Sequence, residues 1–163
     1  MIIGLSNGEI LVLIYSLAIK EIVIIIRVVE KSQSGINSLS LLNVSDYTLC
    51  LIGTEEGSID LYEFDLKKNE LNLLTRKENA HYSSIRAVKI ILYVKTITIF
   101  SDSYDQKLNI WKYENLQLTK ITHYDHSISD INYIDCLVKK NCIYLSHGGF
   151  GNEVIQLFST LFT

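Results

Sequence analysis

The residues from 123 to 126 come closest to a metal site in this sequence. His123, Asp125 and His126 lie close together, and two histidines three residues apart can each give a ring nitrogen to one ion. A zinc site needs further ligands, and the neighbouring sequence offers none. The segment also falls in an expected loop between two strands. We therefore expect the chain to hold neither a metal ion nor a cofactor.

Three glycines near the end of the chain could cradle a phosphate group. Gly148, Gly149 and Gly151 are close together, but phosphate loops need a helix N-terminus or a nest of backbone amides behind them. A strand is expected to follow here, so a plain turn is the favoured interpretation. No P-loop occurs, and we expect neither a nucleophile elbow nor a methyl-donor site. The chain is thus expected not to be an enzyme and to have no small-molecule substrate.

Composition places few constraints on partners. The formal net charge is -3 and the pI is about 5.8, so contact with nucleic acid or an anionic membrane must be local. The three cysteines, Cys50, Cys136 and Cys142, form no C-x-x-C pair and lie in apolar segments. We interpret them as reduced core residues, which suits a cytosolic or nuclear compartment, and of these we expect a cytoplasmic location.

The most apolar stretch does not resemble a membrane span. It runs over residues 10–29 and is interrupted by Lys20, Glu21 and Arg27, whereas a membrane helix needs roughly 20 predominantly apolar residues. No basic segment precedes this stretch, which argues against a signal peptide. We therefore expect no contact with a membrane.

A repeated pattern of short strands organises the chain. Three units open at Ile36, Ile85 and Ile128, which follow one another at intervals of 49 and 43 residues. Each unit then leads through a polar turn into six residues that alternate between apolar and polar and end in an aromatic side chain. These segments are 57–62, 106–111 and 153–158, with a partial copy at 8–13. A period of two predicts strands with one buried face.

The expected fold is all-β. Segments rich in Ile, Val, Leu, Thr and Tyr alternate with clusters of Ser, Asn, Asp and Gly, and no window shows a helical stripe. With four strands a to d in each sheet, the chain supplies strands b, c and d in residues 1–31 and strands a, b and c in 125–163. Two complete sheets are expected between them, in 32–79 and 80–124.

The third unit resembles the WD-repeat (WD40) family. In that family a Gly-His pair precedes the first strand of each unit and a Trp-Asp pair ends the third. Here Ala80-His81 and Trp111-Lys112 occupy these places. The resemblance implies β-propeller blades, about three to four of them, since WD units run to about 40–45 residues plus loop insertions.

The same resemblance implies a buried chain of hydrogen bonds. Asp105 would hold His81, His81 would bond Ser101, and Ser101 would reach the indole N–H of Trp111. His81 beside a carboxylate could also form an acid–base pair, but the sequence shows no nucleophile for it to serve. A structural role is therefore the favoured interpretation, because partly buried polar groups need mutual partners.

The other units depart from the family pattern. Ser32 stands at the histidine position of the second unit and Tyr124 at that of the fourth. Tyr62 and Phe158 stand for the tryptophan, and Lys112 replaces the aspartate of the name-giving pair.

A propeller ring needs at least four blades and usually has more. We therefore expect this chain to be the C-terminal part of a larger propeller. The alternative is that a second chain completes the ring.

A closer resemblance covers roughly residues 32–158. The order of the segments 34–39, 80–81, 103–111 and 148–151 is similar to the C-terminal blades of the WD-repeat partner subunit of the tRNA anticodon-loop 2'-O-ribose methyltransferases. It implies a non-catalytic subunit that binds the methyltransferase chain and positions tRNA for methylation at the wobble nucleotide. The alternative is a general WD scaffold for protein–protein interaction in another assembly, which the fold supports equally well.

Lysines are expected to gather on one rim of the propeller. They lie in the a–b and c–d loops, and the candidates for contact with RNA or a partner are Lys67, Lys68, Lys95, Lys139 and Lys140. Lysine side chains on such a rim can contact phosphate groups. Acidic residues lie on the same rim, so a solvated surface is the alternative.

Overall fold

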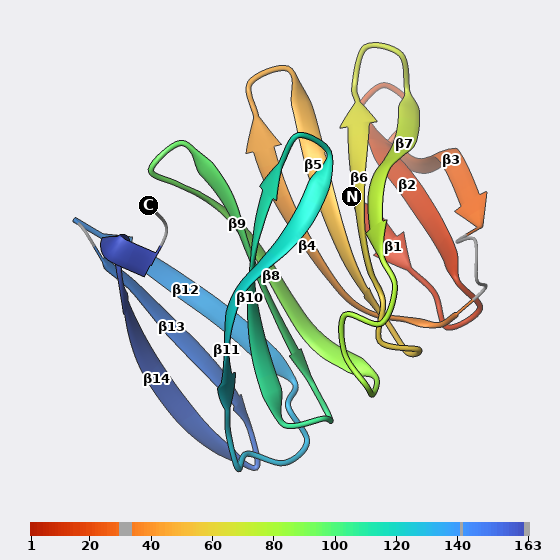
Figure 1. The fold of residues 1–163 in the computed structure, drawn as a ribbon. Coiled ribbons are helices and arrows are strands. Elements are labelled where there is room, and N and C mark those ends of the chain that lie inside the picture. Colours follow the sequence, from red (N-terminus) through yellow and green to blue (C-terminus); the bar gives the residue numbers. More distant parts are fainter. Residues whose placement is uncertain (30–33, 141, 162–163) are drawn as a thin grey trace.

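A computed structural model describes residues 1–29, 34–140 and 142–161. Within these residues the chain forms fourteen strands, one short 3-10 helix and no α-helix, so the prediction of an all-β protein is confirmed. Four antiparallel sheets lie side by side (Figure 1). The first sheet contains β1 (Ile2–Gly4), β2 (Glu9–Ser16) and β3 (Glu21–Val29). The second contains β4 (Ile36–Val44), β5 (Tyr47–Thr54), β6 (Ile59–Asp65) and β7 (Glu70–Lys77).

The third and fourth sheets complete the chain. The third contains β8 (Ile85–Tyr93), β9 (Thr96–Ser103), β10 (Lys107–Glu114) and β11 (Gln117–Asp125). The fourth contains β12 (Tyr133–Lys139), β13 (Cys142–Gly149) and β14 (Gly151–Phe158), and the 3-10 helix Ser159–Leu161 follows. Within each sheet, every strand pairs with the next strand in sequence, so each sheet is a simple up-and-down meander. Ser32 lies outside the described residues.

Tight turns join the strands. Val94 and Lys95 both have positive φ between β8 and β9, as do Asn115 and Leu116 between β10 and β11. Two successive positive φ angles form the type I′ turn, whose twist matches that of the flanking strands.

The hydrophobic core is divided into three clusters, one between each pair of neighbouring sheets. The cluster between the first and second sheets includes Ile10, Val12, Cys50, Ile52, Tyr62, Phe64 and Leu71. The cluster between the second and third includes Leu49, Leu51, Leu61, Val88, Ile90, Ile99 and Trp111. The cluster between the third and fourth includes Ala87, Phe100, Leu108, Ile110, Ile134, Ile143, Leu145 and Leu157. Each inner sheet is therefore buried on both faces.

A β-bulge recurs where β2 pairs with β3, β6 with β7 and β10 with β11. The register shifts between Val12 and Leu13, between Leu61 and Tyr62, and between Ile110 and Trp111. Leu13, Tyr62 and Trp111 thus occupy one structural position, as the alternating six-residue segments predict.

The fourth unit does not follow this alignment, and the expectation for Phe158 is wrong. Phe158 pairs with Cys142 at the end of β14, and 58% of its surface is exposed. The place of Trp111, which lies opposite Ile99, belongs instead to Ile155, which lies opposite Leu145. The cause is the turn before β14, which is shorter than the turn before β10 and so shifts the strand relative to the sequence pattern.

In the part of the chain that the structure describes, no sheet packs against the outer face of the fourth sheet. Leu137 and Val154 on this face are 63% and 66% exposed. Apolar side chains are also exposed around the turn between β2 and β3, among them Leu17, Ile19 and Ile22. Among the described residues, no helix has the length and apolar character needed to span a bilayer.

Candidate functional site

His81 lies in the connection between the second and third sheets, where the backbone holds it in place. Its N–H donates to the carbonyl oxygen of Gly57 at 3.0 Å. Gly57 has a φ of +86°, and a Cβ atom there would lie 2.6 Å from the carbonyl oxygen of His81. Glycine is therefore needed at this position, both for its backbone conformation and for the close approach of the two segments.

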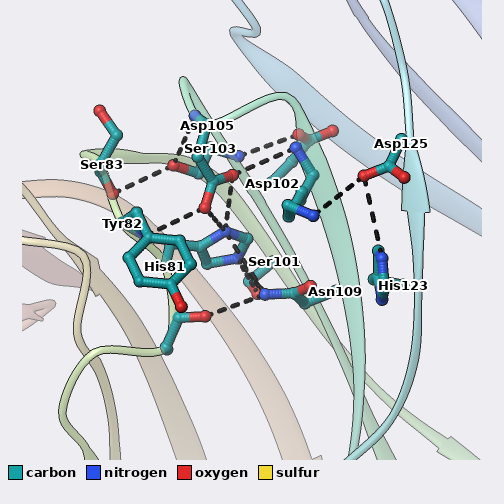
Figure 2. A network of polar contacts seen from close by, with 12 residues as sticks. His81, Tyr82, Ser83, Ser101, Asp102, Ser103, Asp105, Asn109, His123 and Asp125 are labelled. Atoms are coloured by element: carbon teal, nitrogen blue, oxygen red, sulfur yellow. Dashed lines mark hydrogen bonds and ion pairs between the residues drawn. The ribbon is translucent and has the colours of Figure 1, made fainter.

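The structure brings the four residues of the expected chain together in order, and Figure 2 shows three of them, His81, Ser101 and Asp105. His81 Nδ1 lies 3.0 Å from Asp105 Oδ1, and His81 Nε2 lies 2.8 Å from Ser101 Oγ. The indole Nε1 of Trp111 donates to Ser101 Oγ at 2.9 Å. The imidazole of His81 is buried completely, and Trp111 is only 2% exposed.

The donors and acceptors of this chain match. The indole donates to the serine, the serine hydroxyl donates to His81 Nε2, and His81 Nδ1 donates to the carboxylate of Asp105. Burial would raise the pKa of Asp105, but the hydrogen bond and charge of His81 and the backbone N–H groups of Tyr82 and Lys107 outweigh it and lower that pKa. The carboxylate is therefore the negative end of a continuous chain of hydrogen bonds.

Asn109 belongs to the same network, although the sequence patterns do not single it out. Its side-chain nitrogen donates to the carbonyl oxygen of Ala80 at 2.9 Å and lies 3.1 Å from His81 Nε2. It ties the histidine loop to β10 and is buried there. The one sequence signal that marks it is a polar residue in the alternating segment 106–111.

Ser101, His81 and Asp105 have the order of a catalytic Ser-His-Asp triad. The serine hydroxyl is nevertheless fully buried and already accepts the indole N–H of Trp111. A nucleophile must reach a substrate carbonyl beside an oxyanion hole, and this hydroxyl has no opening to one. The arrangement suits a structural lock better than acyl transfer.

A second histidine network lies between the third and fourth sheets. Asp102, next to Ser101 on β9, points to the opposite face. Its Oδ1 lies 2.8 Å from Nε2 of His126, and its Oδ2 lies 2.6 Å from Nδ1 of His147 on β13. All three side chains are buried, with exposures of 0% for Asp102, 1% for His126 and 0% for His147.

His126 corresponds to His81, so the expectation that Tyr124 takes this position is wrong. The N–H of His126 donates to the carbonyl oxygen of Gln106 at 3.1 Å, as that of His81 does to Gly57. Tyr124 is still part of β11, where it pairs with Leu108 and is 36% exposed. The strand β11 continues further than the sequence pattern indicates, which moves the histidine position two residues along the chain.

The sequence cluster of His123, Asp125 and His126 does not converge on one point. His123 Nε2 lies 3.8 Å from Asp125 Oδ1, and both side chains are largely exposed. Lys107 Nζ contacts the same carboxylate oxygen at 3.1 Å. His126 is buried and turns to Asp102 instead, so the three residues do not form a shared site.

The glycine cluster forms a hairpin turn, as the favoured interpretation predicts. Gly149 and Gly151 pair across the turn between β13 and β14, with Phe150 at its tip. A Cβ atom on Gly149 would lie 2.2 Å from the carbonyl oxygen of Asp130, so this glycine makes room for the neighbouring loop.

One segment has the spacing of a nucleophile elbow, contrary to the expectation that none occurs. Gly4-Leu5-Ser6-Asn7-Gly8 matches G-x-S-x-G. It forms the turn between β1 and β2, two antiparallel strands. An elbow needs a strand that leads through a sharp turn into a helix, so this context does not support a nucleophile at Ser6.

The buried polar side chains of the second sheet gather around an arginine. Arg76 on β7 contacts the carboxylates of Glu56, Asp60 and Glu78, and its Nη2 donates to Ser58 Oγ at 3.0 Å. Asp60 is fully buried. Burial, together with the charges of Glu56 and Glu78, raises the pKa of Asp60 to about 7.

The five lysines proposed for contact are exposed and lie on one rim (Figure 1). Lys67 and Lys68 are in the turn between β6 and β7, and Lys95 is between β8 and β9. Lys139 ends β12, and Lys140 follows it in the turn to β13. Two of them are paired with acidic residues of the same rim. Lys67 Nζ lies 3.4 Å from Asp46 and Lys68 Nζ lies 3.5 Å from Asp65.

The three cysteines are free. Cys50 is buried, and burial raises the pKa of its thiol to about 12, which keeps it protonated and unreactive. Cys136 and Cys142 are half-buried.

No protein-family model and no curated protein matches this sequence.

Proposed function

We propose that this chain is a set of WD-type β-propeller blades that acts as a non-catalytic binding scaffold. The observation that carries the proposal is the buried chain from Trp111 through Ser101 and His81 to Asp105, set in a sheet with apolar clusters on both faces. It fixes the connection between two sheets and leaves the turns at the rims free to bind partners.

The outer face of the fourth sheet supports an incomplete ring. Exposed Leu137 and Val154 on that face would be covered by a further blade, from a longer chain or from a second chain. The mass of the native protein tests this directly. We expect a mass larger than that of this chain alone, and a stable monomer of these residues would contradict a shared ring.

We further propose that the partner is the catalytic subunit of a tRNA 2'-O-ribose methyltransferase in the cytoplasm. The support is the resemblance of the ordered segments 34–39, 80–81, 103–111 and 148–151 to the WD-repeat subunits of those enzymes. In this role the scaffold binds the catalytic chain and positions tRNA, with the lysine rim as the candidate RNA surface.

Two experiments test this partner. Affinity purification of the tagged native protein should recover a methyltransferase together with tRNA, and deletion of the gene should abolish 2'-O-methylation of the wobble nucleotide. Recovery of other proteins, with wobble methylation intact, would favour a general WD scaffold in another assembly.

The lysine rim is tested by reversing its charge. The triple variant K95E/K139E/K140E should bind tRNA more weakly and with a smaller salt dependence, because phosphate contacts release counterions. The matched control is Lys77→Glu, an exposed lysine at the opposite end of β7. Equal tRNA affinity in the triple variant and the control would remove this rim from the proposal.

A further inference from the structure

We propose that Asp102, His126 and His147 bind one divalent metal ion of the zinc type, which joins the third sheet to the fourth. Asp102 comes from β9, His126 from the connection between β11 and β12, and His147 from β13. One potential ligand atom from each residue lies within 4.8 Å of the other two. An ion at this point would be held by three separate segments of the chain.

The two imidazoles converge on the carboxylate from different directions. Their ring centroids are 5.0 Å apart, and the ring planes are nearly perpendicular, at 79°. His126 presents Nε2 and His147 presents Nδ1 to the same carboxylate, at 2.8 and 2.6 Å. Zinc binds imidazole nitrogen and carboxylate oxygen at about 2.0–2.2 Å, so small side-chain movements place all three atoms around one ion.

Hydrogen bonding alone leaves this network incomplete. If each imidazole donates one N–H to Asp102, then Nδ1 of His126 and Nε2 of His147 remain buried without a hydrogen bond in the described part of the chain. The ion pairs found there for Asp102 are with these two imidazoles only. A buried carboxylate with no cationic partner is costly, and a divalent cation supplies the missing charge.

The outer environment of His147 fits a metal ligand. Glu153 Oε2 lies 3.5 Å from Nε2 of His147, the nitrogen that faces away from Asp102. With a metal bound at Nδ1, the imidazole proton resides on Nε2 and points at this carboxylate, an arrangement that commonly orients metal-binding histidines. Both histidines remain neutral, so binding requires only that their protons move to the other ring nitrogens.

The donor set and its burial indicate the type of ion and its role. Two imidazole nitrogens and one carboxylate suit Zn²⁺ and related first-row ions better than Mg²⁺ or Ca²⁺, which prefer oxygen ligands. Oδ1 of Asp102 also accepts the backbone N–H of Ser103 at 2.9 Å. Because a carboxylate oxygen has two lone pairs, both oxygens of Asp102 could bind the ion and complete four ligands. Because the three side chains are closed to solvent, the ion would be structural.

Cobalt titration of the purified full chain tests the site, with Co²⁺ as the spectroscopic probe. We expect one equivalent to bind, with visible absorption bands of a four-coordinate site that Zn²⁺ then abolishes. His147→Gln should lose these bands. His123→Ala, which removes an exposed histidine beside Asp125, is the matched control and should retain them at full intensity.

Glu153→Gln keeps the test decisive if His147→Gln does not fold. Glu153 is half-exposed, so its replacement should preserve the fold while lowering metal affinity about tenfold or more, as loss of a carboxylate behind a metal-binding histidine does. Two results would overturn the proposal: folded wild-type protein that takes up no cobalt, or cobalt binding that disappears in His123→Ala and persists in His147→Gln.

Discussion

The two histidine networks occupy the same place in successive sheets, yet they are built differently. His81 and His126 each donate a backbone N–H to the turn of the preceding sheet. His81 then finds both its side-chain partners in the third sheet, Asp105 and Ser101. His126 instead reaches back to Asp102, one sheet earlier in the chain. The first network therefore locks a loop to its own sheet, whereas the second joins two sheets.

Differences in sequence between the third and fourth sheets explain why the two histidine networks are built differently. The position of Ser101 is occupied by His147 in the fourth sheet, and the short turn there has no counterpart of Asp105. Asp102, which faces the fourth sheet, supplies the missing carboxylate. A repeat can thus lose part of its own polar network and use a residue of its neighbour.

Replacement of Asp102 by Ala should have the largest effect on stability. It removes the carboxylate that both buried imidazoles contact, and each imidazole left without this partner typically costs about 1–3 kcal/mol. Urea denaturation measures the difference. Asp125→Ala, whose side chain is 72% exposed, is the control and should change stability by less than about 0.5 kcal/mol. Similar losses in both variants would contradict a buried network at Asp102.

Trp111→Phe should cost about 1–3 kcal/mol, because the ring is largely kept but Ser101 loses the indole N–H. Ser101→Ala removes the other partner. In the double variant the losses should not add, since both changes break one contact. Additive free energies of unfolding would show that the indole and the hydroxyl do not interact.

Asp105→Asn tests the negative end of the first network. The pKa of Asp105 is lower in the folded protein than its ordinary value near 3.9. The ionised carboxylate therefore stabilises the folded protein above that pH, and this stabilisation is lost as the pH falls. At pH 6 the variant should be less stable than wild type by about 1 kcal/mol. The difference should shrink at pH 3, and a difference that stays constant would contradict the pairing with His81.

Asp60→Asn sharpens the comparison with the second sheet, where Arg76 contacts the buried carboxylate of Asp60. The folded pKa of about 7 lies above the unfolded value, so the folded protein holds this proton more tightly and wild type loses stability as the pH rises from about 4 to 7. Between pH 5 and 8 the Tm of the variant should therefore fall less than that of wild type. The difference should be about 2–4 °C for each kcal/mol of stability that wild type loses. Asp46→Asn, at an exposed aspartate, should follow wild type.

The sequence predicts the strands well because a period of two identifies a buried face without knowledge of its partner. The same pattern places Leu13, Tyr62 and Trp111 at equivalent bulges. It misplaces Phe158 because the alignment assumes turns of equal length, and the turn at Phe150 is shorter.

The second network lies beyond the sequence patterns for a different reason. Asp102, His126 and His147 are far apart in the chain, and only the packing of two sheets brings them together. Local spacing groups His126 with His123 and Asp125 instead. The signal that distinguishes them is burial, since His126 and His147 are enclosed whereas His123 is not.

Hydrogen exchange at the indole N–H of Trp111 tests the central claim most directly, because the chain has a single tryptophan and its proton gives one resolvable NMR signal. The claim is that this proton is buried between the second and third sheets and is hydrogen-bonded to Ser101, which in turn contacts His81. We expect exchange slowed to the rate of global unfolding, with faster exchange in Ser101→Ala and Asp105→Asn. Exchange of the wild-type indole proton within the dead time of the measurement would contradict the account.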